Sequence, residues 1–470
     1  MQRNTLKSFQ WSFLTAILRK IILFGVFLLI AKAISKEDLG IFREFSLVLA
    51  ILAGFSFVGF KDLLIVKKEN TKALFQQLLL LSVVVSGVAF IILYGFAPLI
   101  GKFYKSEVLA HLLRALSPLI CIEIIRFAFQ SYYHKILRFK LLSIIETINV
   151  VVYSALIIIF YYIKLDIKTL TLIFYFGNLL ELFLLIFFER KLVAETLQRL
   201  FSLQLLKEFL ATYKANSRFL ITATSNNLIS LLGNDIPVIV LGALFNPAAI
   251  GIYYLANQLV AQPVVLACNS LRQVLFPTFT FMNRAEMRTR LHQFYQLVTI
   301  AVYPLFFLFV IYILNFAPLI LGAKWSEALP IVAILAFPLA TTMLINPISS
   351  LPYVLELPHL EIFYMLTGLI LKTAAIFLGH YSGFETAIIY YAISTIILQL
   401  GFIGLVSKIT DDKIFRTLFK LVLKFIPTLI LIALYLLLSG FNPYLRVALL
   451  TVLVGIYLLV SYRLKFIRIK

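Results

Sequence analysis

Polar side chains at helical spacing interrupt two neighbouring apolar stretches of this 470-residue sequence. One stretch carries Asn227 and Asn234, with Asp235 directly after them. The next carries a longer polar stripe whose members step by one or two helical turns: Gln258, Gln262, Asn269 and Arg272. Amide side chains both donate and accept hydrogen bonds, and the planar guanidinium binds phosphate through two parallel bonds. The two stripes therefore favour a hydrated cavity that receives an anionic, polar ligand.

Arg19 belongs to a similar stripe near the start of the chain, where it shares one helical face with Ser12 and Thr15. We expect Arg19 and Arg272 to lie near the cytoplasmic mouth of the cavity as ligands for the anion. The alternative is that both side chains extend along the lipid to the cytoplasmic interface and bind nothing.

Asp235 is the acid we would expect to couple transport to an ion. It lies in the segment GNDIP, in which Gly233 and Pro237 both weaken a helix, and broken helices in transporters often mark coupling or substrate sites. The alternative is an acid that a neighbouring helix neutralises.

Other charged residues inside the apolar stretches are not predicted to bind the substrate. Glu123, Arg126 and Gln130 are spaced for one helical face and predict an internal ion pair. Three further charges have no partner or role that the sequence identifies: Glu146, Glu181 and Lys372.

The elements that must position these residues are transmembrane helices. The chain is 62% hydrophobic and 13% charged, whereas soluble domains are about 45–50% apolar and about 25% charged. A helix of roughly 20 apolar residues crosses a bilayer, and fourteen stretches qualify: 12–33, 42–60, 74–98, 109–130, 141–163, 167–188, 219–244, 250–271, 294–319, 327–353, 361–379, 384–407, 415–438 and 444–462. The loops between them leave no room for a catalytic domain, so we predict a transporter and not an enzyme, without a cofactor or a metal.

Charge in the loops predicts the orientation. Placing both termini in the cytoplasm puts most of the 42 Lys and Arg residues on the cytoplasmic side. This agrees with the positive-inside rule, by which cytoplasmic loops carry an excess of Lys and Arg. The net charge of +21 then faces anionic lipid headgroups, which argues against a nucleic-acid partner. Cys121 and Cys268 both fall in apolar stretches and predict neither a disulfide nor a metal site.

An internal repeat predicts the architecture. FAPLI occurs at 96–100 and again at 316–320, and at the same offset Ser106, Glu107 and Pro118 recur as Ser326, Glu327 and Pro338. A weaker match relates the segment around Gly40 to that around Gly251. The repeat carries each helix onto one six helices later, so both halves enter the membrane in the same direction. We expect the proline of each FAPLI to end its helix.

The fold class predicted is therefore an all-α integral membrane protein of about fourteen transmembrane helices, with two parallel-repeat six-helix bundles and two additional C-terminal helices. The corresponding domains are bundles at 1–188 and 219–410, with the last two helices at 411–470. Residues 189–218 have leucines at helical spacing among charged residues, which predicts an amphipathic helix on the cytoplasmic surface.

Four segments resemble a known family. DLGIFREFSLVLAI (38–51), IGIYYLANQLVAQPVV (250–265), FPTFTFMNRAEMRTRLHQFYQLVTIAVYPLFF (276–307) and LGAKWSEALPIVAILAF (321–337) are similar to the polysaccharide and oligosaccharide flippases of the multidrug, oligosaccharidyl-lipid and polysaccharide (MOP) superfamily. The resemblance extends over nearly the whole chain and agrees with the fold that the repeat predicts.

The resemblance implies a bacterial inner-membrane protein that moves a polyprenyl-pyrophosphate-linked sugar unit to the outer leaflet by alternating access. Its partners would be this lipid-linked oligosaccharide, membrane lipids, and a polysaccharide polymerase with other assembly proteins. Relatives line the cavity with basic residues, which adds Arg43 to Arg19 and Arg272 as candidates. Two alternatives stay open: a drug or organic-cation exporter of the same superfamily, and a non-transporting scaffold for glycan assembly.

Overall fold

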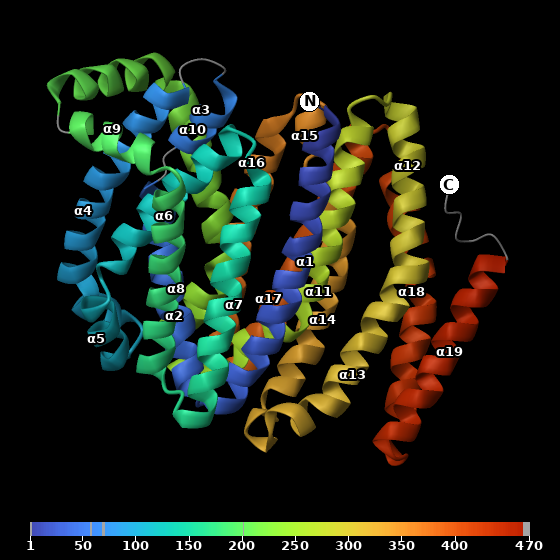
Figure 1. Ribbon diagram of the computed structural model, residues 1–470. Coiled ribbons are helices and arrows are strands. Elements are labelled where there is room, and N and C mark those ends of the chain that lie inside the picture. Colours follow the sequence, from blue (N-terminus) through green and yellow to red (C-terminus); the bar gives the residue numbers. More distant parts are fainter. Residues whose placement is uncertain (1, 57–58, 68–70, 201, 464–470) are drawn as a thin grey trace. The chain divides into compact units, whose positions relative to one another are not determined.

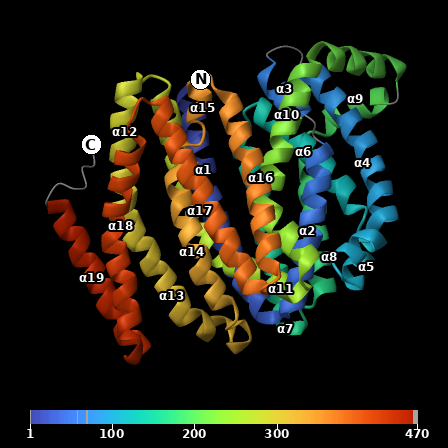
Figure 2. The same ribbon diagram turned by 180° about the vertical axis from the view of Figure 1, so that it is seen from behind.

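The computed structural model describes residues 2–56, 59–67, 71–200 and 202–463, and over these ranges all regular structure is helical. The chain divides into two compact units, Met1–Gly251 and Ile252–Lys470. Figure 1 labels the helices of both units, and Figure 2 shows them from behind.

The helical spans agree closely with the sequence prediction. Eleven helices are long and apolar enough to cross a membrane, and a twelfth span arises when the bent pair α5 and α6 is counted as one. The two other predicted spans, 12–33 and 42–60, coincide with the more highly charged helices α1 (Gln2–Ala33) and α2 (Lys36–Ser56), although residues 57–58 lie outside the described ranges. The predicted all-α, multi-pass membrane fold is confirmed.

The first unit packs its helices around a large apolar core. α1 lies against α7, whereas α2 contacts α4, α5, α6, α8 and α10. The core includes the fully buried rings of Phe45, Phe75 and Tyr133. The remaining helices of this unit are α3 (Phe60–Val66), α4 (Thr71–Phe103), α5 (Glu107–Ala115), α6 (Leu119–Lys135), α7 (Phe139–Ile163), α8 (Ile167–Phe188), α9 (Arg190–Leu200) and α10 (Leu203–Leu244).

The predicted amphipathic segment forms α9 and the first turns of α10, which Figure 1 shows lying crosswise to the upright helices. A kink at Asn216, the one residue of α10 with non-helical backbone angles, separates these turns from the apolar part of α10. The segment buries Leu205 and leaves Leu203, Leu206 and Leu210 exposed. Its location on the cytoplasmic surface stays a prediction, as do the predicted domain limits.

The two glycines that the weaker sequence match relates are in direct contact. A Cβ atom on Gly40 would lie 1.8 Å from the carbonyl oxygen of Pro247, and one on Gly251 would lie 1.9 Å from that of Lys36. Each glycine thus contacts the backbone carbonyl group that lies four residues before the other glycine in the sequence. α2 and the first turn of α11 (Pro247–Phe279) can approach this closely only because both positions lack a side chain.

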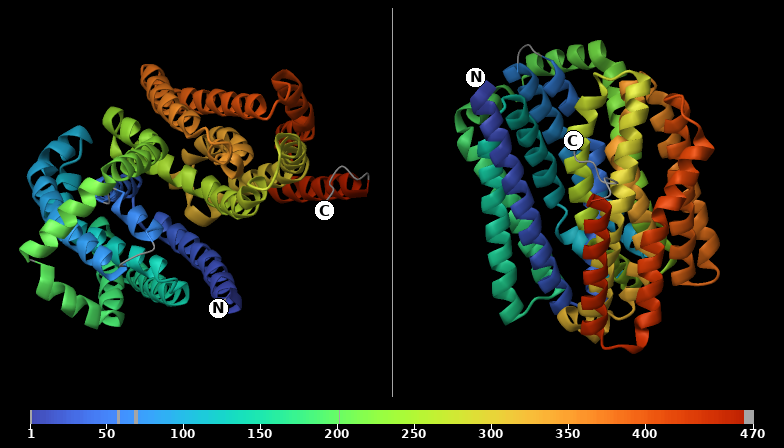
Figure 3. Two further views of the ribbon diagram at one scale, coloured as in Figure 1. Left: turned by 90° about the horizontal axis from the view of Figure 1, so that it is seen from above. Right: turned by 90° about the vertical axis from the view of Figure 1, so that its right-hand side faces the viewer.

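The second unit contains the rest of α11 and the helices after it. α12 (Arg284–Leu297) continues through a π-helical turn (Val298–Val302) into α13 (Tyr303–Leu321). α17 (Phe384–Ile409) packs between α14 (Ala328–Ile345) and α16 (Pro358–His380), side by side in Figure 2. The short α15 (Leu351–Val354) precedes α16, and α18 (Ile414–Leu437) and α19 (Pro443–Arg463) end the chain, with α19 in red at the edge of its unit in Figure 3.

Two expectations about proline are wrong. Pro98 and Pro318, the prolines of the repeated FAPLI, lie inside α4 and α13, which continue to Phe103 and Leu321. Likewise, α10 is unbroken at Gly233 and Pro237. A proline removes one backbone hydrogen bond, and near a helix end or in a packed helix the neighbouring bonds and contacts maintain the helix.

Candidate functional site

The second unit contains a polar cleft of about 380 Å³ beside α11. α11 contributes Asn269 and Arg272 from the predicted stripe, and the segment at the start of α15 contributes Tyr353. The full lining is Asn269, Arg272, Gln273, Pro277, Ser350 and Tyr353. The cleft thus combines one cation, two amides and two hydroxyls within one unit.

Arg272 is available to a ligand in this cleft. Its side chain is exposed, and within residues 252–463 no carboxylate lies within ion-pair distance of it. Glu361 of α16 is buried and interacts electrostatically with both Arg272 and Tyr353. Because no carboxylate of this unit forms an ion pair with Arg272 among the described residues, its guanidinium can donate to an anion in the cleft.

The rest of the polar stripe on α11 lies outside this cleft. Gln262 donates its amide to Gln258, one turn earlier, so the two side chains satisfy each other in part. Both are half-buried. The sequence predicts that the four residues of the stripe act together, and the structure brings only Asn269 and Arg272 into one cleft.

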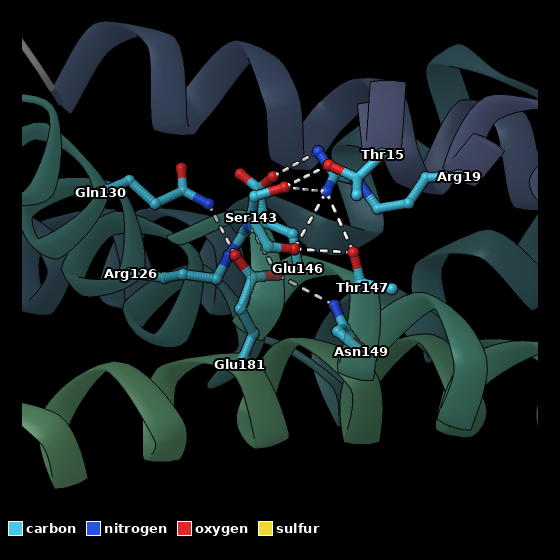
Figure 4. Close-up of polar contacts among 9 residues, drawn as sticks. All are labelled: Thr15, Arg19, Arg126, Gln130, Ser143, Glu146, Thr147, Asn149 and Glu181. Carbon is cyan, nitrogen blue, oxygen red and sulfur yellow. Dashed lines mark hydrogen bonds and ion pairs between the residues drawn. The ribbon is translucent and has the colours of Figure 1, made fainter. Parts of the chain in front are cut away.

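Arg19 lies in the first unit and is fully engaged with α7 (Figure 4). Its Nη2 donates to the Glu146 carboxylate at 2.7 Å, and its Nη1 donates to the Ser143 hydroxyl at 2.9 Å and to Thr147 at 3.2 Å. The Thr15 hydroxyl, from the same face of α1, lies 2.5 Å from that of Ser143. These contacts join α1 to α7 and leave Arg19 partnered.

Arg126 forms the centre of a second charged cluster, also drawn in Figure 4. It donates to Glu123 at 2.6 Å, which confirms the predicted ion pair, and to Glu181 of α8 at 3.2 Å. Gln130 and Asn149 donate to the same Glu181 carboxylate at 2.6 and 2.9 Å. Glu146 and Glu181, for which the sequence indicated no partner, therefore each accept bonds from an arginine.

Arg43 and Asp235 pair with each other across α2 and α10. The predicted substrate ligand and the predicted coupling acid are thus one ion pair, with about a fifth to a quarter of each side chain exposed. Their predicted roles are not tested by this contact. The alternative interpretation of Asp235, an acid neutralised by a neighbouring helix, describes its geometry here.

The remaining predicted residues are dispersed. Asn227 donates to Asp62 of α3 at 3.2 Å, and Asn234 is exposed one turn before the buried Pro237. Lys372, in the middle of α16, is half-buried. Sequence analysis missed Gln273, Ser350 and Tyr353. The last two belong to the short helix α15 and its N-cap, and no periodicity reveals that this helix lies next to α11.

Comparison with known proteins identifies the family. The model of the polysaccharide biosynthesis protein family matches residues 29–330. The chain belongs to this family. It is 26% identical over 372 residues to the teichuronic acid biosynthesis protein TuaB of Bacillus subtilis, an alignment that covers 77% of this chain and 74% of TuaB. It is 23% identical over 358 residues to the lipopolysaccharide biosynthesis protein WzxC of Escherichia coli, covering 75% and 70% of the two chains.

Solved structures share the fold. The lipid II flippase MurJ in an inward closed conformation matches with a TM-score of 0.75 at 15% identity, over 97% of this chain and 99% of MurJ. A multidrug resistance MATE transporter of the MOP superfamily in an inward-facing conformation matches with a TM-score of 0.57 at 14% identity, over 84% and 96%. These likenesses show the shared fold, and the match over residues 29–330 confirms the polysaccharide biosynthesis family that the sequence resembles.

Proposed function

We propose that this protein is a flippase that moves a polyprenyl-pyrophosphate-linked oligosaccharide from the cytoplasmic to the outer leaflet of the bacterial inner membrane. The product would serve the synthesis of a surface polysaccharide such as O-antigen, capsule or exopolysaccharide. Support comes from the family, from relatives named for teichuronic acid and lipopolysaccharide biosynthesis, and from the fold shared with a lipid II flippase.

The observation that carries the proposal is the unneutralised Arg272 in its polar cleft. A diphosphate presents oxygens that a guanidinium binds in pairs, and the amides of Asn269 and Gln273 suit sugar hydroxyls. Moving a charged headgroup through hydrocarbon is costly unless protein groups replace its water. The cleft would supply that replacement while the lipid tail stays in the bilayer, and no covalent step is needed.

Arg19 and Arg43 would take a second part in transport. Each is held by a carboxylate in this conformation, Arg19 by Glu146 and Arg43 by Asp235. An arriving diphosphate competes with a carboxylate for the same bidentate geometry. In the proposed cycle of alternating access, these arginines exchange partners when the headgroup passes, whereas Arg272 binds it first.

The orientation follows from the distribution of positive charge. Both termini would lie in the cytoplasm, with the basic ends of the helices against anionic lipid headgroups. A polymerase and other assembly proteins would receive the flipped unit on the outer side. A cleft lined by arginine and amides suits this substrate better than it suits an organic cation.

Mass spectrometry of polyprenyl-linked glycans tests the proposal. Cells without the gene should accumulate the completed lipid-linked unit, and Arg272→Ala should reproduce that accumulation. Arg416→Ala, at an exposed position on α18 outside the cleft, is the matched control and should leave the pool unchanged. A lipid-linked pool that does not change on deletion would refute the glycan substrate, and drug-export assays on the same strains would then decide whether an organic cation is carried.

A further inference from the structure

Glu44 is the most completely buried acid described in the first unit. Its exposed fraction is 0%, and neither carboxyl oxygen has a hydrogen-bond partner anywhere in the described residues. Two other buried acids, Glu123 and Glu181, are 8% and 3% exposed, but both accept bonds from Arg126. Glu44 is therefore not a member of a structural ion pair, and the mechanism of substrate binding does not use it.

The surroundings of Glu44 are backbone and apolar groups. It lies against α10 at Gly242, where a Cβ atom would come within 3.2 Å of Glu44 Oε1 and 2.5 Å of the Tyr104 ring. Next to it is a cleft of about 360 Å³ lined by apolar side chains such as Val48 and Leu93, with Tyr104. Nothing here replaces the water that an ionised carboxylate needs.

The described cations closest to Glu44 in the chain and at this end of α10 bind other groups. Arg43, the preceding residue of α2, pairs with Asp235 of α10, and Lys105 donates to the Leu244 carbonyl at 2.9 Å. Tyr104 interacts electrostatically with Glu44, Arg43 and Asp235. Among the described residues of α4, α5, α6 and α8, which also pack on α2, no charged group offsets the burial of Glu44.

An ionised carboxylate without a partner is much less favourable in such a site than in water, so the group takes up a proton instead. We propose that Glu44 is a proton-binding site: its carboxyl is neutral in this conformation and ionises in another, in which water or the Arg43 guanidinium reaches it. The proton site follows from the burial alone, whereas its use in coupling rests on the proposed transport function.

The Arg43–Asp235 pair offers a way for Glu44 to change from its neutral to its ionised form. Arg43 and Glu44 are adjacent on α2, so a small rotation of α2 against α10 would bring Glu44 toward water as Arg43 leaves Asp235. Binding or release of one proton would then accompany the exchange of partners. Glu44, and not the already neutralised Asp235, would be the acid that couples a proton gradient to transport.

Infrared difference spectroscopy on the purified full-length protein tests the proton site without any substrate. At neutral pH the spectrum should contain the C=O stretching band of a protonated carboxyl, shifted in D₂O. Glu44→Gln, which keeps size and neutrality, should remove the band with unchanged thermal stability. Glu37→Gln, an exposed acid on the same helix, should retain it. A neutral-pH spectrum of Glu44→Gln identical to that of the wild type would overturn the proton site.

A second measurement separates the coupling role from the transport function. In the glycan assay above, Glu44→Gln should accumulate the lipid-linked unit and Glu37→Gln should not. If deletion and Arg272→Ala cause accumulation but Glu44→Gln does not, the flippase function stands and coupling through Glu44 is wrong. If deletion causes no accumulation, the proposed function is wrong, and the infrared result still decides whether Glu44 holds a proton.

Discussion

Four arginines inside or beside the apolar helices differ in their partners between the two units. In the first unit, Arg19, Arg43 and Arg126 each pair with a carboxylate from another helix. In the second unit, Arg272 lines a cleft with amides and hydroxyls and has no carboxylate within ion-pair distance among residues 252–463. Paired charges hold helices together, whereas an unpaired one remains available to a ligand. In this conformation the three paired arginines therefore contribute to helix packing, and Arg272 is the one of the four that is open to a ligand.

The largest expected effect tests the structural role. Glu181→Ala should lower the free energy of unfolding by about 3–5 kcal/mol, because it leaves Arg126, Gln130 and Asn149 without their shared acceptor. Thermal unfolding of the purified protein in detergent measures the loss.

The matched control is Glu195→Ala, which breaks the exposed pair with Lys72. More than half of each side chain in this pair is accessible, so the loss should be below about 1 kcal/mol. Similar losses for the two variants would show that the buried cluster contributes no more to stability than a surface pair.

An intermediate effect compares the units directly. Arg19→Ala should lower the free energy of unfolding by about 2 kcal/mol, since Glu146 loses its charged hydrogen bond. Arg272→Ala should change it by no more than about 0.5 kcal/mol and still abolish transport. Unfolding curves and the glycan assay on the same preparations give both quantities. An equal destabilisation by Arg272→Ala would mean that its cleft is a packing contact, which would contradict the difference between Arg272 and the paired arginines.

The smallest effect concerns a carboxylate at a helix end outside the membrane spans. Asp166 accepts a hydrogen bond from the Thr169 amide at 2.8 Å at the start of α8, and this bond holds the pKa of Asp166 below its ordinary value. Asp166→Ala should cost about 1 kcal/mol at neutral pH. The contribution is present above the ordinary carboxyl pKa and disappears as the pH falls through it toward the folded value. Unfolding temperatures of wild type and variant that differ equally at pH 7 and pH 3 would refute this assignment.

Matching residues of the internal repeat have different local structures in the two halves of the chain. Pro118 and Pro338 occupy matching positions, but Pro118 lies at the 58° bend between α5 and α6, whereas Pro338 lies inside the continuous α14. Matching residues thus predicted the order and direction of the helices and did not predict where each helix bends. Pro118 is exposed whereas Pro338 is buried within its unit, and this difference in burial depends on the tertiary structure.

The sequence by itself determined the membrane class, the helical spans, the repeat, the family and the Glu123–Arg126 pair. The membrane class, the spans and the ion pair depend on composition or on residues close in the chain, because burial in lipid and helical periodicity act locally. The repeat and the family follow from comparing sequence segments, which needs no tertiary structure. Only the tertiary structure decided that Arg43 binds Asp235, 192 residues away, that Glu181 joins Arg126, and that Tyr353 lies beside Arg272. It also separated Glu44, which has no hydrogen-bond partner among the described residues, from acids that look the same in sequence. The cost of a buried charge is set by its neighbours in space.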